Sequence, residues 1–192
     1  MVAPMARRSP GAGVTPVIRR IDDDLAAPAA RRTPAFDVAA GTPDPEIPTL
    51  TIEDLGILRS VDVTPSGIVA TITPTYSGCP AMREIAADVQ ARLNRAGFER
   101  VTVATQLAPA WSTDWITPEG RRKLATSGIV PPVPAQRRTG PVPLNLSRAP
   151  SPRCPRCDSS DTRLTAQFSA TACKSLHRCN ACGEPFEAVK PI

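Results

Sequence analysis

Six cysteines are the residues of this chain best suited to metal chemistry, and four of them form two Cys-x-x-Cys pairs. The pairs are Cys154/Cys157 and Cys179/Cys182, with twenty-one residues between them. A two-residue gap lets both sulfurs of a pair face one ion, and two such pairs complete a tetrahedral four-thiolate site. Gly183 supplies the left-handed residue that such a turn needs. The spacing therefore predicts a structural Zn²⁺ site, although iron or an iron–sulfur cluster would use the same ligands.

Two further donors, Cys173 and His177, lie between these pairs. A ligand set with either of them in place of Cys179 is conceivable, but it would leave one paired cysteine without a metal, so we expect the four-cysteine set. Cys173 stands beside Lys174 as an accessory thiol that is either reactive or buried within the module. His177 is the only histidine, and we expect it on the surface of a strand rather than at a metal.

The sixth cysteine, Cys79, stands where an alternating strand pattern ends and a helical pattern begins. If Pro80 takes the first helical position, Cys79 becomes the N-cap or its neighbour, beside unpaired backbone N–H groups. The helix dipole would then lower the pKa of the thiol and favour the thiolate, which binds metals and attacks electrophiles. The alternative is a half-buried cysteine that behaves as a small hydrophobic residue. The residues expected to support a site there are Thr73, Thr75, Tyr76 and Ser77 through their hydroxyls, and Gly78 because it lets a ligand come close.

A rigid acidic turn lies ahead of the first strand. Pro45 and Pro48 exclude a helix and force an extended turn, which fixes Asp44 and Glu46 with little remaining freedom. Further on, residues 54–56 (Asp-Leu-Gly) indicate a turn that leads into a strand.

Hydrophobic periodicity predicts the elements that position these residues. We expect helices over residues 33–40, 81–96 and 118–126, strands over 57–63, 68–73 and 100–107, and tail strands around 164–168 and 186–189. Gly97 and Gly128 are expected to end the second and third helices. Trp111 and Trp115 fit the closing of a small core better than a lid or a partner contact.

The 23 prolines divide the chain, because they gather before residue 48 and between residues 131 and 152. We therefore expect a disordered arm over residues 1–32, an α/β domain over 33–130, a Pro-rich linker over 131–152 and a metal-ribbon module over 153–192. The formal net charge of +5 belongs to the tail and linkers, whereas the central domain is slightly acidic, so nucleic acid is not expected as a partner. No apolar run is long enough to span a bilayer, and we expect a soluble cytoplasmic protein with reduced thiols.

The common catalytic signatures are absent from the sequence. It contains no G-x-S-x-G, no phosphate-binding loop, no dinucleotide fingerprint and no H-E-x-x-H, and it has one histidine. A cysteine–histidine catalytic pair would require His177 to reach Cys79 across two domains. We therefore expect a protein that handles metal or sulfur for another protein rather than an enzyme.

Several motifs together resemble a known family. Residues 44–48 (DPEIP), 54–56 (DLG), 73–80 (TPTYSGCP) and 111–132 resemble the iron–sulfur assembly domain of SufT-like proteins and cytosolic cluster-targeting factors. With residues 171–174 (TACK), Cys179 and residues 184–186 (EPF), the chain is similar to the PaaD family, the D subunits of bacterial phenylacetyl-CoA epoxidase (phenylacetate-CoA oxygenase) systems. The resemblance covers about residues 35–190.

This resemblance implies an α+β fold, with a small mixed sheet and helices followed by a zinc-ribbon-like β module. It implies an accessory subunit that assists iron or iron–sulfur cluster delivery in phenylacetate degradation, with Cys79 as the transient iron or cluster thiolate and Asp44 and Glu46 at the border of its site. The implied partners are the di-iron oxygenase and the iron–sulfur flavin reductase of the system, and a homodimer is an option. The alternative is a non-catalytic docking subunit that bridges oxygenase and reductase through Trp111, Trp115 and the basic tail.

Overall fold

The computed structural model describes residues 32–76, 78–133 and 151–191. The predicted N-terminal arm, most of the predicted linker, and Ser77 lie outside the described residues. Within the described residues, none of the helices is both long and apolar enough to cross a lipid bilayer.

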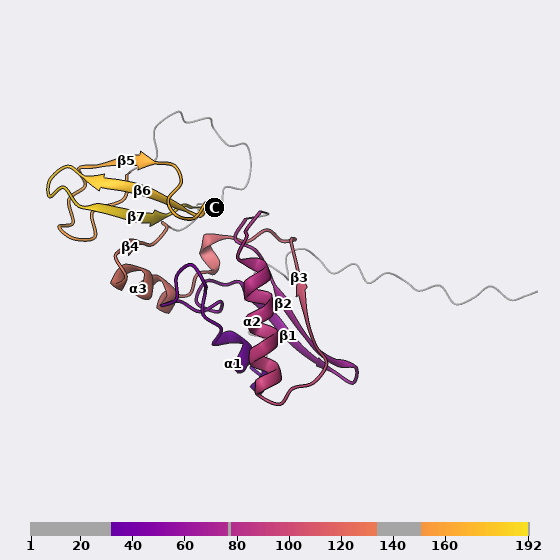
Figure 1. The fold of residues 1–192 in the computed structure, drawn as a ribbon. Helices are drawn as coiled ribbons and strands as arrows, with labels where there is room; N and C mark the ends of the chain where they lie inside the picture. Colours follow the sequence, from indigo (N-terminus) through magenta and orange to yellow (C-terminus); the bar gives the residue numbers. More distant parts are fainter. Residues whose placement is uncertain (1–31, 77, 134–150, 192) are drawn as a thin grey trace, which may run out of the picture.

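The first part of the chain forms a three-stranded mixed sheet with helices packed on it (Figure 1). Strand β1 (Leu58–Thr64) pairs antiparallel with β2 (Gly67–Ile72), and β2 pairs parallel with β3 (Val101–Thr105). The parallel pair requires a crossover, which α2 (Met82–Arg95) supplies. Helix α1 (Pro34–Ala40) lies beside α2, and α3 (Pro118–Thr126) follows the 3₁₀ turn η2 (Thr113–Trp115).

Local capping explains why two of the predicted helices begin where they do. The Thr33 side chain accepts a hydrogen bond from the Phe36 N–H at 3.1 Å, and Thr117 accepts from the Gly120 N–H at 2.9 Å. Each cap is followed by a proline in the first turn. Gly97 has a φ of 88°, as expected for the residue that ends α2. The helix stripe predicted from the sequence is buried at Ile85, Val89 and Leu93.

The turn at residues 54–56 is a close-packed joint of the first domain. Gly56 has a φ of 67°, and a Cβ added there would lie 2.6 Å from the Trp115 Cβ. Trp111 is 5% exposed, and its indole N–H donates to the Leu55 carbonyl at 2.9 Å. The preference for a core role of the tryptophans is thus confirmed for Trp111. Trp115 is partly buried, with the Arg59 guanidinium 3.7 Å from the centroid of its ring.

The C-terminal module is a four-stranded sheet of order β4-β7-β6-β5. Strands β5 (Thr162–Ala166), β6 (Lys174–Cys179) and β7 (Pro185–Val189) form an antiparallel meander, and β4 (Ile129–Val130) pairs parallel with β7. The predicted strand around 164–168 is displaced by two residues, because β5 begins at Thr162 and ends at Ala166, and Phe168 is 65% exposed. Lys190 covers the Phe168 ring instead, with its ammonium 4.1 Å from the ring centroid.

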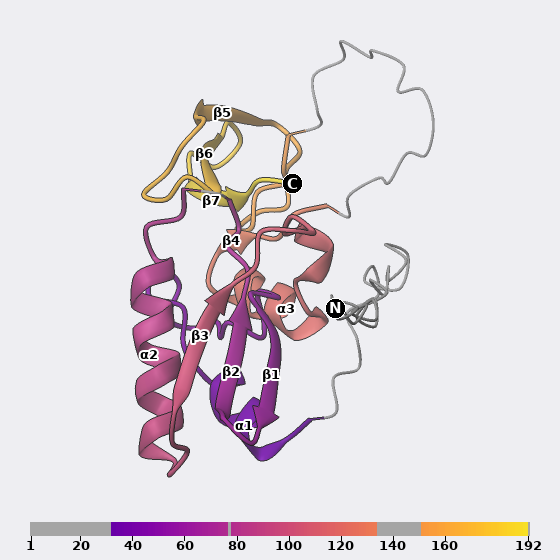
Figure 2. The same cartoon turned by 90° about the vertical axis from the view of Figure 1, so that its right-hand side faces the viewer.

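Strand β4 joins the two parts of the molecule. It follows α3 in the chain, yet its only strand partner among the described residues is β7 of the C-terminal module. Val189, at the end of β7, is buried in the same hydrophobic cluster as the stripe of α2. Figure 2 shows the resulting arrangement, with the module seated on the end of the first sheet where α2 begins.

Candidate functional site

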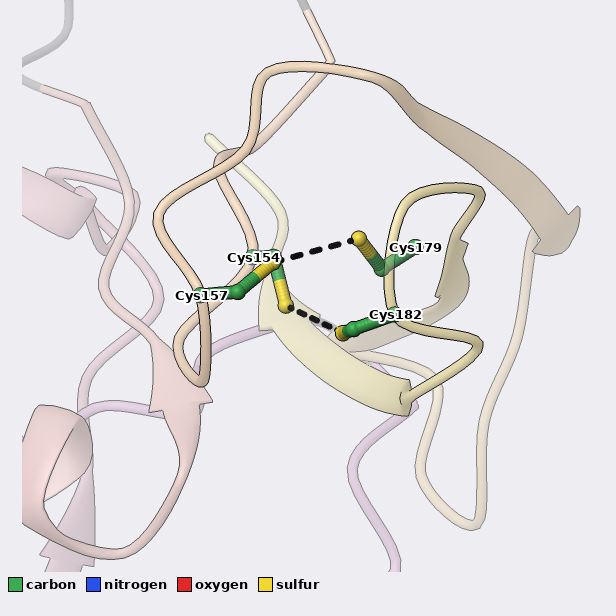
Figure 3. Close-up of side chains that lie close together, drawn as sticks. All are labelled: Cys154, Cys157, Cys179 and Cys182. Atoms are coloured by element: carbon green, nitrogen blue, oxygen red, sulfur yellow. Dashed lines mark hydrogen bonds between the residues drawn. The ribbon is translucent and has the colours of Figure 1, made fainter.

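The two Cys-x-x-Cys turns converge as the sequence predicts. Cys154 Sγ lies 3.7 Å from Cys182 Sγ, and Cys157 Sγ lies 3.6 Å from Cys179 Sγ (Figure 3). All four sulfurs lie within 4.8 Å of one another, with Cys154 and Cys179 buried and the other two exposed. None of these cysteines is in a disulfide, so the four thiols are available as ligands.

The two turns share one backbone design. In each, the residue four positions after the first cysteine donates its N–H back to that cysteine's carbonyl: Asp158 to Cys154 at 2.9 Å and Gly183 to Cys179 at 3.0 Å. Both donors are left-handed, with φ values of 57° and 78°. The sequence indicates this conformation at Gly183 but not at Asp158, because aspartate only occasionally adopts it.

This donor set fits a tetrahedral metal ion. Zinc–sulfur bonds of about 2.3 Å place the sulfurs of a regular tetrahedron about 3.8 Å apart, close to the two distances in the structure. The Cys182 N–H lowers the pKa of Cys179 to about 7, which favours its thiolate over those of ordinary cysteines. The Ser159 N–H also acts to lower the pKa of Cys157, but proton sharing with the other three sulfurs raises it to about 12. Metal binding must therefore displace protons from this site.

The alternative ligand sets do not form. His177 is 6% exposed, bonds the Ser175 hydroxyl through Nε2 at 2.9 Å, and stacks on Phe186 with ring centroids 5.5 Å apart. The expectation of a surface histidine is therefore wrong, because β6 is an inner strand of the sheet and His177 faces the module's interior. Cys173 is half-buried just before β6 and contacts Thr171 Oγ1 at 3.1 Å.

Cys79 lies near the start of α2, but not at its cap. The first helical residue is Met82, and Ala81 occupies the N-cap position. Burial raises the pKa of the Cys79 thiol, and the Ala81 N–H only partly opposes this. The prediction of a lowered thiol pKa is therefore wrong for the metal-free protein, since burial and nearby negative charge outweigh the helix start. The thiol is half-buried and packs against the main hydrophobic cluster.

The acidic turn does come close to Cys79. The charges of Glu46 and Asp44 both raise the pKa of the Cys79 thiol, after burial. Asp44 is 6% exposed, and its Oδ1 accepts the N–H groups of Glu46 at 2.9 Å and Ile47 at 2.8 Å. Asp44 thus holds the turn together, while the Glu46 side chain is exposed and free of such a structural bond among the described residues.

The structure describes only some of the residues whose hydroxyls are expected around Cys79. Thr73 is 1% exposed, and its Oγ1 has no hydrogen-bond partner within the described residues. Thr75 is partly buried, and Ser77 lies outside the described residues. Gly78 is exposed, and a Cβ there would make only an ordinary contact with the Tyr76 ring at 3.7 Å. A role for Gly78 in close ligand approach stays a prediction.

Sequence reasoning missed one association. The charge of Cys173 raises the pKa of Cys79, and Glu46 raises the pKa of both thiols. Two thiols from different parts of the chain and the acidic turn therefore lie within electrostatic reach of one another. No local pattern could reveal this, because it depends on how the C-terminal module docks.

Comparison with known proteins covers both parts of the chain. Residues 138–190 match the family described as PaaD zinc beta ribbon domain, and residues 40–104 match the family described as iron–sulfur cluster assembly protein. A curated Escherichia coli (strain K12) protein, named as a putative D subunit of 1,2-phenylacetyl-CoA epoxidase, is 45% identical over 150 residues, covering 78% of this chain and 87% of the relative.

Two solved structures are similar to this chain over part of its length. A domain of unknown function (DUF59) from Bacillus anthracis is 26% identical, covers 47% of this chain and 87% of its own, and superimposes with a TM-score of 0.43. A Mycobacterium tuberculosis protein described as associated with Fe–S complex assembly and repair is also 26% identical, covers 62% of this chain and 98% of its own, and gives a TM-score of 0.29.

Proposed function

This chain belongs to the PaaD family, that of the D subunits of 1,2-phenylacetyl-CoA epoxidase, and we propose that it is an accessory subunit that helps install iron or an iron–sulfur cluster in a partner. The partners we propose are the di-iron oxygenase and the iron–sulfur flavin reductase of that system. Cys79 is the thiolate that holds the cargo in transit, and the cargo is a substrate of the protein rather than its own cofactor.

The observation that carries this proposal is the setting of Cys79. The thiol is half-buried on the connection between β2 and α2, with the carboxylates of Asp44 and Glu46 within electrostatic reach. A negatively charged setting disfavours a free thiolate but favours a thiolate bound to a cation, because the metal charge replaces the lost proton. Such a thiol stays protonated and unreactive without cargo, and it becomes a ligand when a metal ion binds.

The four-cysteine site serves a different purpose in this proposal. Cys154, Cys157, Cys179 and Cys182 hold a zinc ion that closes the C-terminal module, because a site with four protein ligands leaves no open position for substrate. Zinc cross-links the module there and takes no part in the transfer of cargo.

One of the two tryptophans named in the docking alternative is not available to a partner. Trp111 is buried and hydrogen-bonded to the Leu55 carbonyl, so it offers no surface to a partner. The proposed delivery role rests on no such exposed residue, and substitution of the thiol tests it directly.

The test is replacement of Cys79 in cells that express the epoxidase system, followed by purification of the oxygenase. We expect Cys79→Ser to leave the tail zinc content and the unfolding midpoint unchanged, and to lower the iron content and epoxidase activity of the oxygenase at least tenfold. Cys79→Ala is a second test variant, which also lacks the thiol but keeps an apolar side chain in the half-buried position. If the thiol acts as a ligand, both variants fail alike. Wild-type iron loading and activity with Cys79→Ser would rule the delivery role out.

A further inference from the structure

Cys173 lies at the end of the C-terminal module that docks on the first part of the chain. Lys174, the first residue of β6, pairs with Val189 of β7, and the Lys190 N–H donates to the Cys173 carbonyl at 3.0 Å. Val189 is 8% exposed and buried in the main hydrophobic cluster, against which Cys79 is also packed. The strand end that carries Cys173 is therefore held against the same cluster as Cys79.

The two backbone views agree on how the segments that carry these cysteines lie. In Figures 1 and 2 the connection between β2 and α2, which carries Cys79, reaches the end of β7 beside the C-terminus. Both thiols are half-buried, so each is shielded from bulk solvent but not sealed in the interior. Neither belongs to the four-cysteine group, whose ligands are complete without them.

The charges around the two thiols are mostly negative. Glu46 and Asp44 lie on the side of the first domain, and the charge of Glu46 raises the pKa of Cys173 as well as that of Cys79, in each case after burial. Lys174 is the cation that faces them, but it is 5% exposed and ion-paired with Glu187 at 2.7 Å. Two thiols and two carboxylates thus face one lysine that is already neutralised, which favours a bound cation.

We propose that Cys173 is the second thiolate of the cargo site, so that an iron ion or a small iron–sulfur cluster is held between Cys79 and Cys173 with Glu46 at its edge. This inference rests on the delivery role proposed above and names the second ligand of that same site. Sulfur ligands select thiophilic metals such as iron over magnesium or calcium. Binding of a divalent ion breaks two S–H bonds, forms two metal–sulfur bonds and releases two protons to solvent, with no change in oxidation state.

Both thiolates of this site come from one chain. A single thiolate is a weak anchor for iron, and a second copy of the protein would be one way to supply another. Here the C-terminal module supplies it instead. The cargo is therefore expected at one per chain, and binding should not depend on protein concentration through dimerisation.

Cobalt(II) is the probe for this site, because thiolate-to-cobalt charge-transfer absorption grows with the number of thiolate ligands. The protein is first loaded with one equivalent of zinc, which fills the four-cysteine site and resists displacement since zinc binds more tightly than cobalt. Anaerobic titration of the full chain should then show one further cobalt per chain with two thiolate ligands. Cys79→Ser and Cys173→Ser should each halve the charge-transfer absorption per cobalt and weaken binding at least tenfold.

The matched control is Ala172→Ser, which places a hydroxyl beside Cys173 and removes no thiol; it should bind cobalt like the wild type. Zinc content measured in parallel should equal one per chain in every variant, which separates a lost ligand from a lost fold. Wild-type cobalt binding by Cys173→Ser, or absence of a second cobalt in the wild type, would overturn the inference. The delivery role is judged separately, by oxygenase iron loading in cells with Cys79→Ser. Loss of loading with Cys79→Ser but not with Cys173→Ser leaves delivery standing and removes only the second ligand.

Discussion

Removal of zinc should unfold the C-terminal module while the first domain stays folded, and replacement of one zinc ligand should weaken zinc binding. The module's own hydrophobic cluster consists of Cys154, Cys179 and Phe186, with Val130 packed against it. Two of its three members are thus metal ligands. Burial of one phenylalanine contributes about 2–3 kcal/mol, whereas ordering the backbone of residues 151–191 costs roughly 1–2 kcal/mol per residue. Hydrogen bonds in three short strands cannot close that gap, so the metal must contribute a large part of the stability.

The expected size of the effect follows from the metal. Structural zinc sites with four ligands contribute about 10–16 kcal/mol, so one ligand accounts for roughly 3 kcal/mol, or about a hundredfold in zinc affinity. Cys179→Ser should therefore bind zinc about a hundredfold more weakly than the wild type in competition with a chromophoric chelator. Cys173→Ser removes a thiol from the same module without removing a zinc ligand, and should bind zinc like the wild type.

Amide hydrogen exchange shows where structure is lost. In zinc-depleted protein the amides of β5 and β6 should exchange nearly as fast as in an unfolded chain, while the amides of α2 keep their protection. Helix α2 is a sound internal reference, because its stripe of Ile85, Val89 and Leu93 is at most 1% exposed and lies in the large cluster. Full protection of β5 and β6 without metal, or equal zinc loss in Cys179→Ser and Cys173→Ser, would refute the reasoning.

Two further predictions concern the joint that supports the first domain. Gly56→Ala should lower the free energy of unfolding by about 2–4 kcal/mol in urea titrations, because it combines a φ of 67° with a Cβ 2.6 Å from Trp115; Gly97→Ala, with a φ of 88° and nothing within 4 Å of the added Cβ, should cost only about 1 kcal/mol. Equal losses would show that the contact does not matter. Asp54 is buried with Lys123 Nζ at 2.6 Å, and although burial acts to raise its pKa, the hydrogen bonds from Lys123 and Thr51 bring it below the usual value. A carboxyl with a lowered folded pKa stabilises above its unfolded pKa of about 4 and loses that contribution as the pH falls through the folded value. Lys123→Met should therefore be about 1–2 kcal/mol less stable than the wild type at pH 7, with the difference shrinking as the pH falls through the lowered folded pKa of Asp54; a difference independent of pH would contradict this.

Local chemistry is what makes much of the fold predictable. Helices α1 and α3 carry their start signals in four consecutive residues each, a threonine cap followed by proline, and the structure uses both. The spacing of the four cysteines likewise predicts their convergence, because each Cys-x-x-Cys turn is built by hydrogen bonds within five residues. Where the cause lies within one turn of chain, the sequence displays it.

The predictions that are wrong or missing concern features set by contacts between distant segments of the chain. The pattern predicts His177 on the surface, but β7 and β5 flank its strand and bury it. A helix start predicts a lowered thiol pKa for Cys79, but burial, residues of the acidic turn and Cys173 raise it. Strand β4 has only two residues and leaves no periodic trace, yet it pairs with residues 187 and 188. Each of these depends on contacts between segments far apart in the chain, which no window of sequence contains.

Strand β7 connects the four-cysteine site with the proposed site at Cys79 and Cys173, which would make the two interdependent. It pairs with β6, which ends at the zinc ligand Cys179 and begins beside Cys173, and its own last residue, Val189, is buried in the cluster that also contacts Cys79. Loss of zinc would release β6 from this sheet and with it the position of Cys173. A protein without zinc should then keep Cys79 in place and still lose its two-thiolate site for cobalt. The four-cysteine site, though chemically closed, would in this way decide whether the chain can accept cargo at all.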